Sequence, residues 1–395
     1  MPITKTIEEI NARIRAGSAV VLTAEEVARM GETASPAEIA ARVDVVTTAT
    51  FGPMCSSGAF INFGHTTPGL RMEEITLNDV PVYGGVAAVD GYIGATSVRP
   101  GDPEYGGGHV IEDLAAGRPL RLRARGRGTD CYPGREVDTW ITKDTVNEIF
   151  LFNPRNAYQN YGVAVNSSAR TLHTYMGTLL GRLGNASYAT SGELSPLLND
   201  PDLRTIGLGT RIFLCGTEGY VAWPGTQFHT SRERNEHGVP VLPGATLAVV
   251  GNLKEMSTEY LRAAVFEKYG VSLFVGIGIP IPVLDEDLAR RVSIRNEQIE
   301  TTVFDYGTPG HDALGRTNYA RLRAGELELD GRRIPCSAQS SLSRARRIAE
   351  ELGRRIRAGA FTLTAPVMAF PTGTSLRRCP EPAAAPAAAP QGGAK

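Results

Sequence analysis

Cys55 stands in a loop whose residue types suit thiol chemistry. It lies in the segment 52–58, GPMCSSG, where small side chains leave backbone amides free to point at an anion. Such amides lower the pKa of a thiol and stabilise a thiolate, a persulfide or a developing oxyanion. The pattern indicates a nucleophilic Cys55 with Ser56 and Ser57 as candidate substrate-binding residues. A buried structural cysteine is the alternative, because free cysteine is among the most buried residue types.

Cys131 follows a run of arginines at alternate positions. On a β-strand, Arg121, Arg123, Arg125 and Arg127 would share one face and could favour a thiolate or bind a substrate carboxylate. Arg123, Arg125 and Arg127 are therefore candidate substrate-binding residues. A solvated, charged face of an edge strand would give the same pattern.

Two of the six histidines are candidate general acids or bases. His65 follows the Cys55 loop, and His109 ends the glycine run 106–108, which we take to be a flexible loop. Either could equally be an ordinary surface histidine. The chain has no C-x-x-C pair and no histidine pair at i, i+4, so we expect no metal site and no cofactor bound in this chain. Electrons for a redox step would have to come from another protein.

Composition excludes several classes of protein. With 395 residues and 42% hydrophobic content, the chain can bury a large core without disulfides. A formal net charge of -1 gives no global attraction for nucleic acid or anionic membrane. Five cysteines are too few for a secreted disulfide framework. The N-terminus lacks the features of a signal peptide, and no apolar run is long enough to span a membrane, so we expect a cytoplasmic protein.

The spacing of residues predicts an α/β fold of mixed sheets with flanking helices, glycine-rich loops and short N-terminal helices. Three helices are expected before residue 45, two of them with capping boxes at Thr23/Glu26 and Ser35/Glu38. A strand at 43–48 leads into the Cys55 loop. The glycine-dense stretch 64–135 predicts strands and tight turns with no long helix.

Further along, a strand–helix–strand pattern favours some parallel pairing. Other strands are expected at 136–142, 148–152, 162–165 and 210–223, the βαβ unit at 245–251, 257–269 and 271–279, a hairpin at 326–334 and a helix at 341–358. We expect one catalytic region over residues 1–375, with room for two subdomains. An Ala/Pro-rich tail over 380–395 is expected to be disordered.

Three segments carry a resemblance to a known family. They are 48–59 (TATFGPMCSSGA), 62–65 (NFGH) and 127–134 (RGTDCYPG), and they resemble the homocysteine-biosynthesis family of L-aspartate semialdehyde sulfurtransferases. The resemblance implies conversion of L-aspartate semialdehyde to L-homocysteine through a cysteine persulfide, with Cys55 and Cys131 as the functional cysteines. It also implies reduction by a ferredoxin-like iron–sulfur partner protein. Sulfide or another donor would supply the sulfur, and assembly into a homo-oligomer stays open.

On this hypothesis Cys131 attacks the inner sulfur of a Cys55 persulfide and leaves a disulfide for the partner to reduce. Two other functions fit the residues. One is an acyl or thioester transferase that uses Cys55 alone. The other is a non-enzymatic redox or ligand-sensing module in which the two thiols switch conformation.

Overall fold

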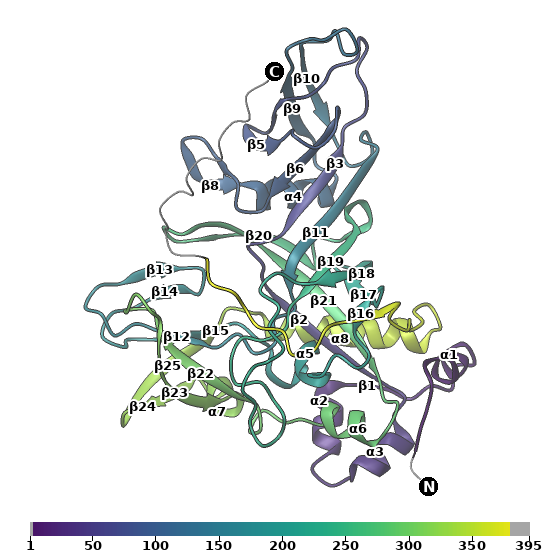
Figure 1. Cartoon of the computed structure of the whole chain (residues 1–395), viewed down its shortest axis with the longest axis vertical. Helices are drawn as coiled ribbons and strands as arrows, with labels where there is room; N and C mark the ends of the chain where they lie inside the picture. Colours follow the sequence, from purple (N-terminus) through teal and green to yellow (C-terminus); the bar gives the residue numbers. More distant parts are fainter. Residues whose placement is uncertain (1–2, 380–395) are drawn as a thin grey trace, which may run out of the picture.

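The computed structural model describes residues 3–379, in which a large and a smaller β-sheet are flanked by helices (Figure 1). The large sheet has 14 strands. Its pairs are antiparallel except β1–β2. In spatial order the strands are β1 (Val21–Thr23), β2 (Val45–Pro53), β21 (Gly270–Pro282), β17 (Arg211–Leu214), β18 (Thr217–Pro224), β19 (Leu247–Asn252), β11 (Glu148–Asn156), β3 (Gly58–Asn62), β6 (Asp90–Gly94), β5 (Val80–Tyr83), β4 (Glu74–Leu77), β9 (Leu120–Arg125) and β10 (Glu136–Ile141), and β20 (Leu261–Phe266) also pairs with β21.

The smaller sheet mixes parallel and antiparallel pairs. Its order is β23 (Asp312–Asn318), β22 (Glu300–Asp305), β12 (Val163–Val165), β15 (Ala186–Tyr188), β25 (Arg332–Ala338) and β24 (Glu326–Leu329). The pairs β12–β22 and β15–β25 are parallel. The predicted mixed α/β class is confirmed. No helix within residues 3–379 is long and apolar enough to cross a membrane.

The N-terminal helices form as predicted. They are α1 (Ile7–Arg15), α2 (Ala24–Met30) and α3 (Pro36–Arg42). The side chains of Thr23 and Ser35 accept hydrogen bonds from the third amide of α2 and α3. In return, the carboxylates of Glu26 and Glu38 accept hydrogen bonds from the backbone amides of Thr23 and Ser35. These bonds satisfy amides that a first helical turn leaves free.

The helix predicted at 257–269 is wrong. Its place is taken by β20, which forms an antiparallel hairpin with β21 and pairs with it from Leu261↔Val275 to Phe266↔Gly270. Lys268 and Gly270 adopt positive φ angles in the turn, which a helix does not permit. Apolar residues at helical spacing also fit an edge strand here, since Val265 is 41% exposed. The expected βαβ unit is therefore absent from this part of the chain.

The glycine-dense stretch forms the expected strands and also contains one ten-residue helix. It is α4 (Gly107–Ala116), and the glycines begin it instead of forming a flexible loop. A Cβ on Gly107 would lie 1.9 Å from the carbonyl oxygen of Gly94, and one on Gly108 would lie 2.5 Å from that of Ser272. The glycines are required because the helix begins in close contact with two strands.

The C-terminal elements match the prediction. Strands β24 and β25 form the hairpin, with its turn at Asp330 and Gly331. Helix α8 (Leu342–Arg357) packs its apolar face, which includes the buried Ile348, on β2 and β21. The tail predicted to be disordered, 380–395, lies outside the described residues.

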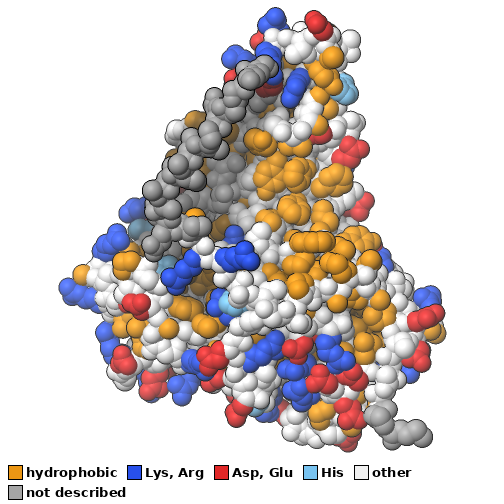
Figure 2. Space-filling view, in the orientation of Figure 1, with side chains coloured by type: hydrophobic (Ala, Val, Ile, Leu, Met, Phe, Trp, Pro, Cys, Tyr) orange, Lys and Arg blue, Asp and Glu red, His pale blue; other side chains and the backbone are white. Residues whose placement is uncertain are grey.

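One face of the large sheet is apolar and exposed. Figure 2 shows hydrophobic side chains gathered over its upper half. Phe60 on β3 lies opposite Phe150 on β11, and both are more than a third exposed. The other face of these strands carries buried residues such as Ile61 and Ile149.

Candidate active site

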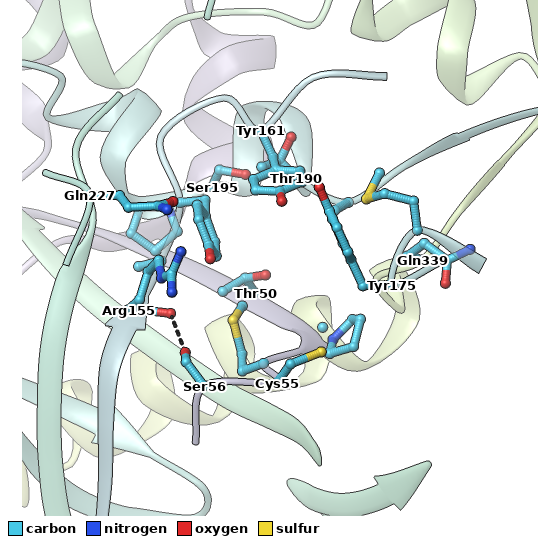
Figure 3. A pocket seen from close by; sticks show the side chains of 18 of the residues that line it. Thr50, Cys55, Ser56, Arg155, Tyr161, Tyr175, Thr190, Ser195, Gln227 and Gln339 are labelled. Carbon is cyan, nitrogen blue, oxygen red and sulfur yellow. Dashed lines mark hydrogen bonds between the residues drawn. The ribbon is translucent and has the colours of Figure 1, made fainter. Parts of the chain in front are cut away.

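A cavity of about 340 Å³ lies beside the turn that joins β2 to β3, and Cys55 lines it. Figure 3 shows side chains from distant parts of the chain converging on this space. They come from the β2–β3 turn, from the end of β11 and the segment after it, and from Tyr175 and Tyr269. Most of these residues are brought together by pairing between strands far apart in the sequence.

Cys55 is fixed by its turn and by β21. The amide of Ser57 donates to the carbonyl of Met54 at 3.0 Å, which closes the turn around Cys55 and Ser56. The Cys55 Sγ lies 3.2 Å from the hydroxyl of buried Ser272 on β21. The Cys55 and Ser56 amides donate no hydrogen bond to any atom of residues 3–379. The sequence predicted free backbone amides in this loop, and those of Cys55 and Ser56 are free.

The two serines of the turn have different positions. Ser56 lines the cavity, and its hydroxyl donates to Asn153 Oδ1 at 3.0 Å and to the Arg155 carbonyl at 3.2 Å. Ser57 is buried outside the cavity lining, where its hydroxyl accepts a hydrogen bond from Asn153 Nδ2 at 2.9 Å. Asn153, fully buried on β11, therefore ties the Cys55 turn to the strand that carries Arg155.

Arg155 is the one charged side chain among the described residues that line this cavity. It stands at a bulge in β11, where the pairing with β19 shifts between Asn153 and Asn156. The side chain reaches into the space beside Ser56 (Figure 3). Its Nε is buried without a hydrogen-bond partner, and its guanidinium forms no ion pair within residues 3–379. A half-buried arginine without a counterion is suited to bind an anionic group of a ligand.

Four tyrosines complete the polar lining. Tyr158, Tyr161 and Tyr175, which we call the tyrosine wall, contact one another edge to face, with ring centroids 4.6 and 6.2 Å apart. Burial raises the pKa of Tyr158 to about 12 and raises that of Tyr161 further. Burial, followed by the neighbouring Cys55, raises the pKa of Tyr269. These hydroxyls with raised pKa values stay protonated near neutral pH and can donate hydrogen bonds.

Cys131 lies far from Cys55 within one chain. It is exposed in the segment between β9 and β10, at the upper end of the molecule in Figure 1. Four antiparallel steps lead from β3 to β9, about 19 Å at ~4.8 Å per step. An even number of antiparallel steps leaves β3 and β9 pointing the same way. Because Cys55 precedes β3 and Cys131 follows β9, the two cysteines lie at opposite ends of these strands. A disulfide requires Cα atoms within about 7 Å, so the folded chain does not hold this pair at bonding distance.

The predicted arginines lie with Cys131 and not with Cys55. Arg123 pairs with Asp79 at 2.9 Å, and Arg127 pairs with Glu73 at 3.1 Å. Arg125 is exposed at the end of β9. These three residues lie outside the lining of the Cys55 cavity.

Neither candidate histidine lines the cavity. The ring of His65 is stacked on Tyr132, next to Cys131, with centroids 6.2 Å apart. His109 lies in the first turn of α4, where its Nδ1 accepts a hydrogen bond from the Gly106 amide at 3.3 Å. The prediction that His109 ends a flexible loop was wrong, because Gly106 ends a strand, β8 (Asp102–Gly106), and Gly107 and Gly108 begin α4.

Two other cysteines are held as neutral thiols. Burial raises the pKa of Cys215 to about 12 and that of Cys336 to about 11. No group of three or more His, Cys, Asp or Glu side chains within residues 3–379 has the arrangement of a metal site.

Arg155 and the tyrosines were not predicted from the sequence. A local signal for Arg155 existed, since the charged residue lies near the end of β11, after the apolar run 149–152, but charge near a strand end is common. The spacing of Tyr158 and Tyr161 carried no indication that Tyr175 and Tyr269 would join them. Tyr175 stands in the turn between β13 (Leu172–Thr174) and β14 (Gly177–Leu179), and Tyr269 stands in the turn between β20 and β21, so both depend on hairpins far along the chain.

Comparisons with known proteins agree with the geometry of a thiol site. Residues 19–363 match the family model described as homocysteine biosynthesis enzyme, sulfur-incorporation. The chain is 47% identical over 368 residues to a Methanosarcina acetivorans protein named L-aspartate semialdehyde sulfurtransferase, covering 92% of this chain and 72% of that protein. A Methanocaldococcus jannaschii protein of the same name is 47% identical over 380 residues, with the same two coverages.

No solved structure matches the chain significantly. The family model covers most of the chain, including both sheets and the cavity that Cys55 lines. The chain is therefore an enzyme of the homocysteine biosynthesis, sulfur-incorporation family.

Proposed function

We propose that this enzyme converts L-aspartate semialdehyde to L-homocysteine, with Cys55 carrying the sulfur as a persulfide. One observation supports this most strongly: Cys55 and the unpaired Arg155 line the same cavity. A nucleophilic sulfur and a cation for the substrate carboxylate are the two groups that this reaction requires. The names of the two relatives, at 47% identity, point to the same substrate.

The cavity suits a small zwitterion. We assign the α-carboxylate to Arg155, whose planar guanidinium can donate two parallel hydrogen bonds to it. The described residues of the lining include no aspartate or glutamate, so the α-ammonium would lie against the faces of the tyrosines. The aldehyde carbon would then face Cys55.

The chemistry is a nucleophilic addition followed by reduction. A sulfane donor such as thiosulfate transfers its outer sulfur to the Cys55 thiolate and leaves as sulfite, so forming the persulfide needs no net electrons. The outer sulfur adds to the aldehyde carbon and gives an alkoxide, which takes up a proton. Four electrons and four protons convert this persulfide and the aldehyde to the Cys55 thiol, homocysteine and water. Counted from sulfide, the net reaction needs two electrons and two protons.

The residues around Cys55 supply hydrogen bonds for the addition step. Tyr158, Tyr161 and Tyr269 stay protonated, and the amides of Cys55 and Ser56 are free. Donors that are already oriented stabilise a developing oxyanion in a site that excludes water. The hydroxyl of Ser272 can donate to the Cys55 sulfur and favour its anionic form.

We assign Cys131 a role at the surface, because it is exposed and remote from the cavity. An exposed thiol on this segment is accessible to a protein partner, for which we propose a ferredoxin-like iron–sulfur electron donor. His65, stacked on Tyr132, would act there and not at the aldehyde. Reducing equivalents would thus come from outside the chain.

Mass spectrometry of Cys55 tests the proposal. After exposure to thiosulfate carrying a heavy outer sulfur isotope, the peptide that contains Cys55 should gain one heavy sulfur. The same peptide of Cys55→Ala should gain none. Addition of L-aspartate semialdehyde and a low-potential reductant should move that isotope into homocysteine. A persulfide that persists unchanged in the presence of both would contradict the proposal. An acyl adduct on Cys55 would instead support an acyl transferase.

A further inference from the structure

A second cavity, of about 280 Å³, lies on the other side of the tyrosine wall. It shares Tyr158, Tyr161, Tyr175 and Gln227 with the Cys55 cavity. Tyr175 lines both cavities, and its hydroxyl is hydrogen-bonded to that of Tyr306 at 2.8 Å. The two cavities are therefore neighbours, and a ligand in one contacts side chains that a ligand in the other also contacts.

Arg232 gives the second cavity a positive charge. Its Nε donates to the Pro243 carbonyl at 2.6 Å, which fixes the guanidinium at the cavity lining. Arg232 forms no ion pair with a carboxylate within residues 3–379, and no described aspartate or glutamate lines this cavity. His311, stacked on Tyr306 with ring centroids 4.1 Å apart, adds a further donor.

The charge of Arg232 is partly removed from solvent. Burial lowers the pKa of the Arg232 guanidinium, which means that its charge is partly desolvated. Burial, followed by the charge of Arg232, also lowers the pKa of the nearby His229. A desolvated cation without a protein counterion is stabilised by a bound anion.

We propose that the second cavity binds the sulfur donor as a small sulfur-bearing anion, with Arg232 as its counterion. This inference rests on the proposed function. Arg155 is engaged by the substrate carboxylate, so a second anionic reactant needs a second cation. Polysulfide and thiosulfate are both anionic near neutral pH. Their binding beside the tyrosine wall would place sulfur next to the Cys55 cavity without displacing the semialdehyde.

Direct binding to an anion tests the site apart from catalysis. Thiosulfate is titrated calorimetrically into Arg155→Gln, which removes the cation of the first cavity, and into the double variant Arg155→Gln/Arg232→Gln. We expect binding to the single variant and a roughly 10- to 150-fold weaker affinity in the double variant, the range for losing a hydrogen bond to a charged group. Arg232→Lys in the same background should retain part of the affinity. Equal affinities with and without Arg232 would overturn the proposal.

Kinetics separate the two cavities in the active enzyme. With polysulfide or thiosulfate as separate donors, Arg232→Gln should raise the KM for the donor about tenfold or more and leave the KM for the semialdehyde unchanged. The exposed helix residue Arg42, replaced by Gln, serves as the matched control and should change neither KM. If the wild type forms homocysteine and Arg232→Gln leaves the donor KM unchanged, the second site is refuted and the proposed function is not. A wild-type enzyme that forms no homocysteine refutes the proposed function, and the calorimetric comparison still decides whether the anion site exists.

Discussion

Replacing Arg155 should remove the recognition of the substrate carboxylate and little else. Within residues 3–379 the guanidinium has no hydrogen-bond or ion-pair partner, so Arg155→Gln breaks no ion pair there and leaves no carboxylate unpaired. A hydrogen bond to a charged group contributes about 1.5–3 kcal/mol, which corresponds to a roughly 10- to 150-fold loss of kcat/KM for the semialdehyde. We expect the melting temperature to stay within a few degrees of wild type, because a buried unpaired group is removed.

The assay uses two substrates that differ in one group. Homocysteine formation from L-aspartate semialdehyde is compared with thiol formation from 3-aminopropanal, which has the same aldehyde and amine but no carboxylate. For the wild type, loss of the carboxylate should cost about as much as Arg155→Gln costs with the full substrate. Combining both changes should add little, because they remove the same interaction. A full additional loss for the variant with 3-aminopropanal would refute the assignment of Arg155 to the carboxylate.

Three further outcomes are expected. Cys131→Ser should retain homocysteine formation with a small-molecule reductant and lose most of it with a protein electron donor, and equal losses in both assays would contradict a surface role. Ile348→Ala, in the face of α8 that packs on β2 and β21, should lower the free energy of unfolding by about 2–5 kcal/mol in a denaturant titration, and exposed Val367→Ala should change it little. Hydrogen bonds from Arg354 and Arg355 lower the pKa of Glu351 to about 2. The ionised Glu351 carboxylate therefore stabilises the fold above its ordinary pKa of 4.5, and this stabilisation is lost as the pH falls toward 2. Glu351→Gln should therefore show a shallower loss of melting temperature over that interval than the wild type, and identical slopes would show that this carboxylate does not contribute.

The parts of the fold that depend on local sequence were predictable. Capping boxes specify where α2 and α3 begin, and Asp330-Gly331 specifies a tight turn, because these interactions lie within a few residues. The Cys55 turn was found for the same reason, since a β-branched strand runs directly into small residues. Segment 257–269 shows the limit: its apolar spacing fits a helix as well as an edge strand, and the pairing with β21 decides between them.

The cavity could be predicted only in part. Cys55 and Ser56 line it as expected, but Arg155 and the tyrosines reach it through strand pairing that no local pattern encodes. The arginines on β9 were an attractive prediction for the carboxylate because alternation places them on one face. That face lies several strands away from Cys55, where nearby carboxylates such as Asp79 pair with them.

The central claim is that Cys55 makes the carbon–sulfur bond of homocysteine in this cavity. It is tested most directly by supplying L-aspartate semialdehyde, a sulfur donor and a low-potential reductant to the wild type and to Cys55→Ala, and measuring homocysteine. The wild type should form it catalytically, and the variant should form no more than the enzyme-free mixture. Homocysteine formed by Cys55→Ala at the wild-type rate would contradict the account.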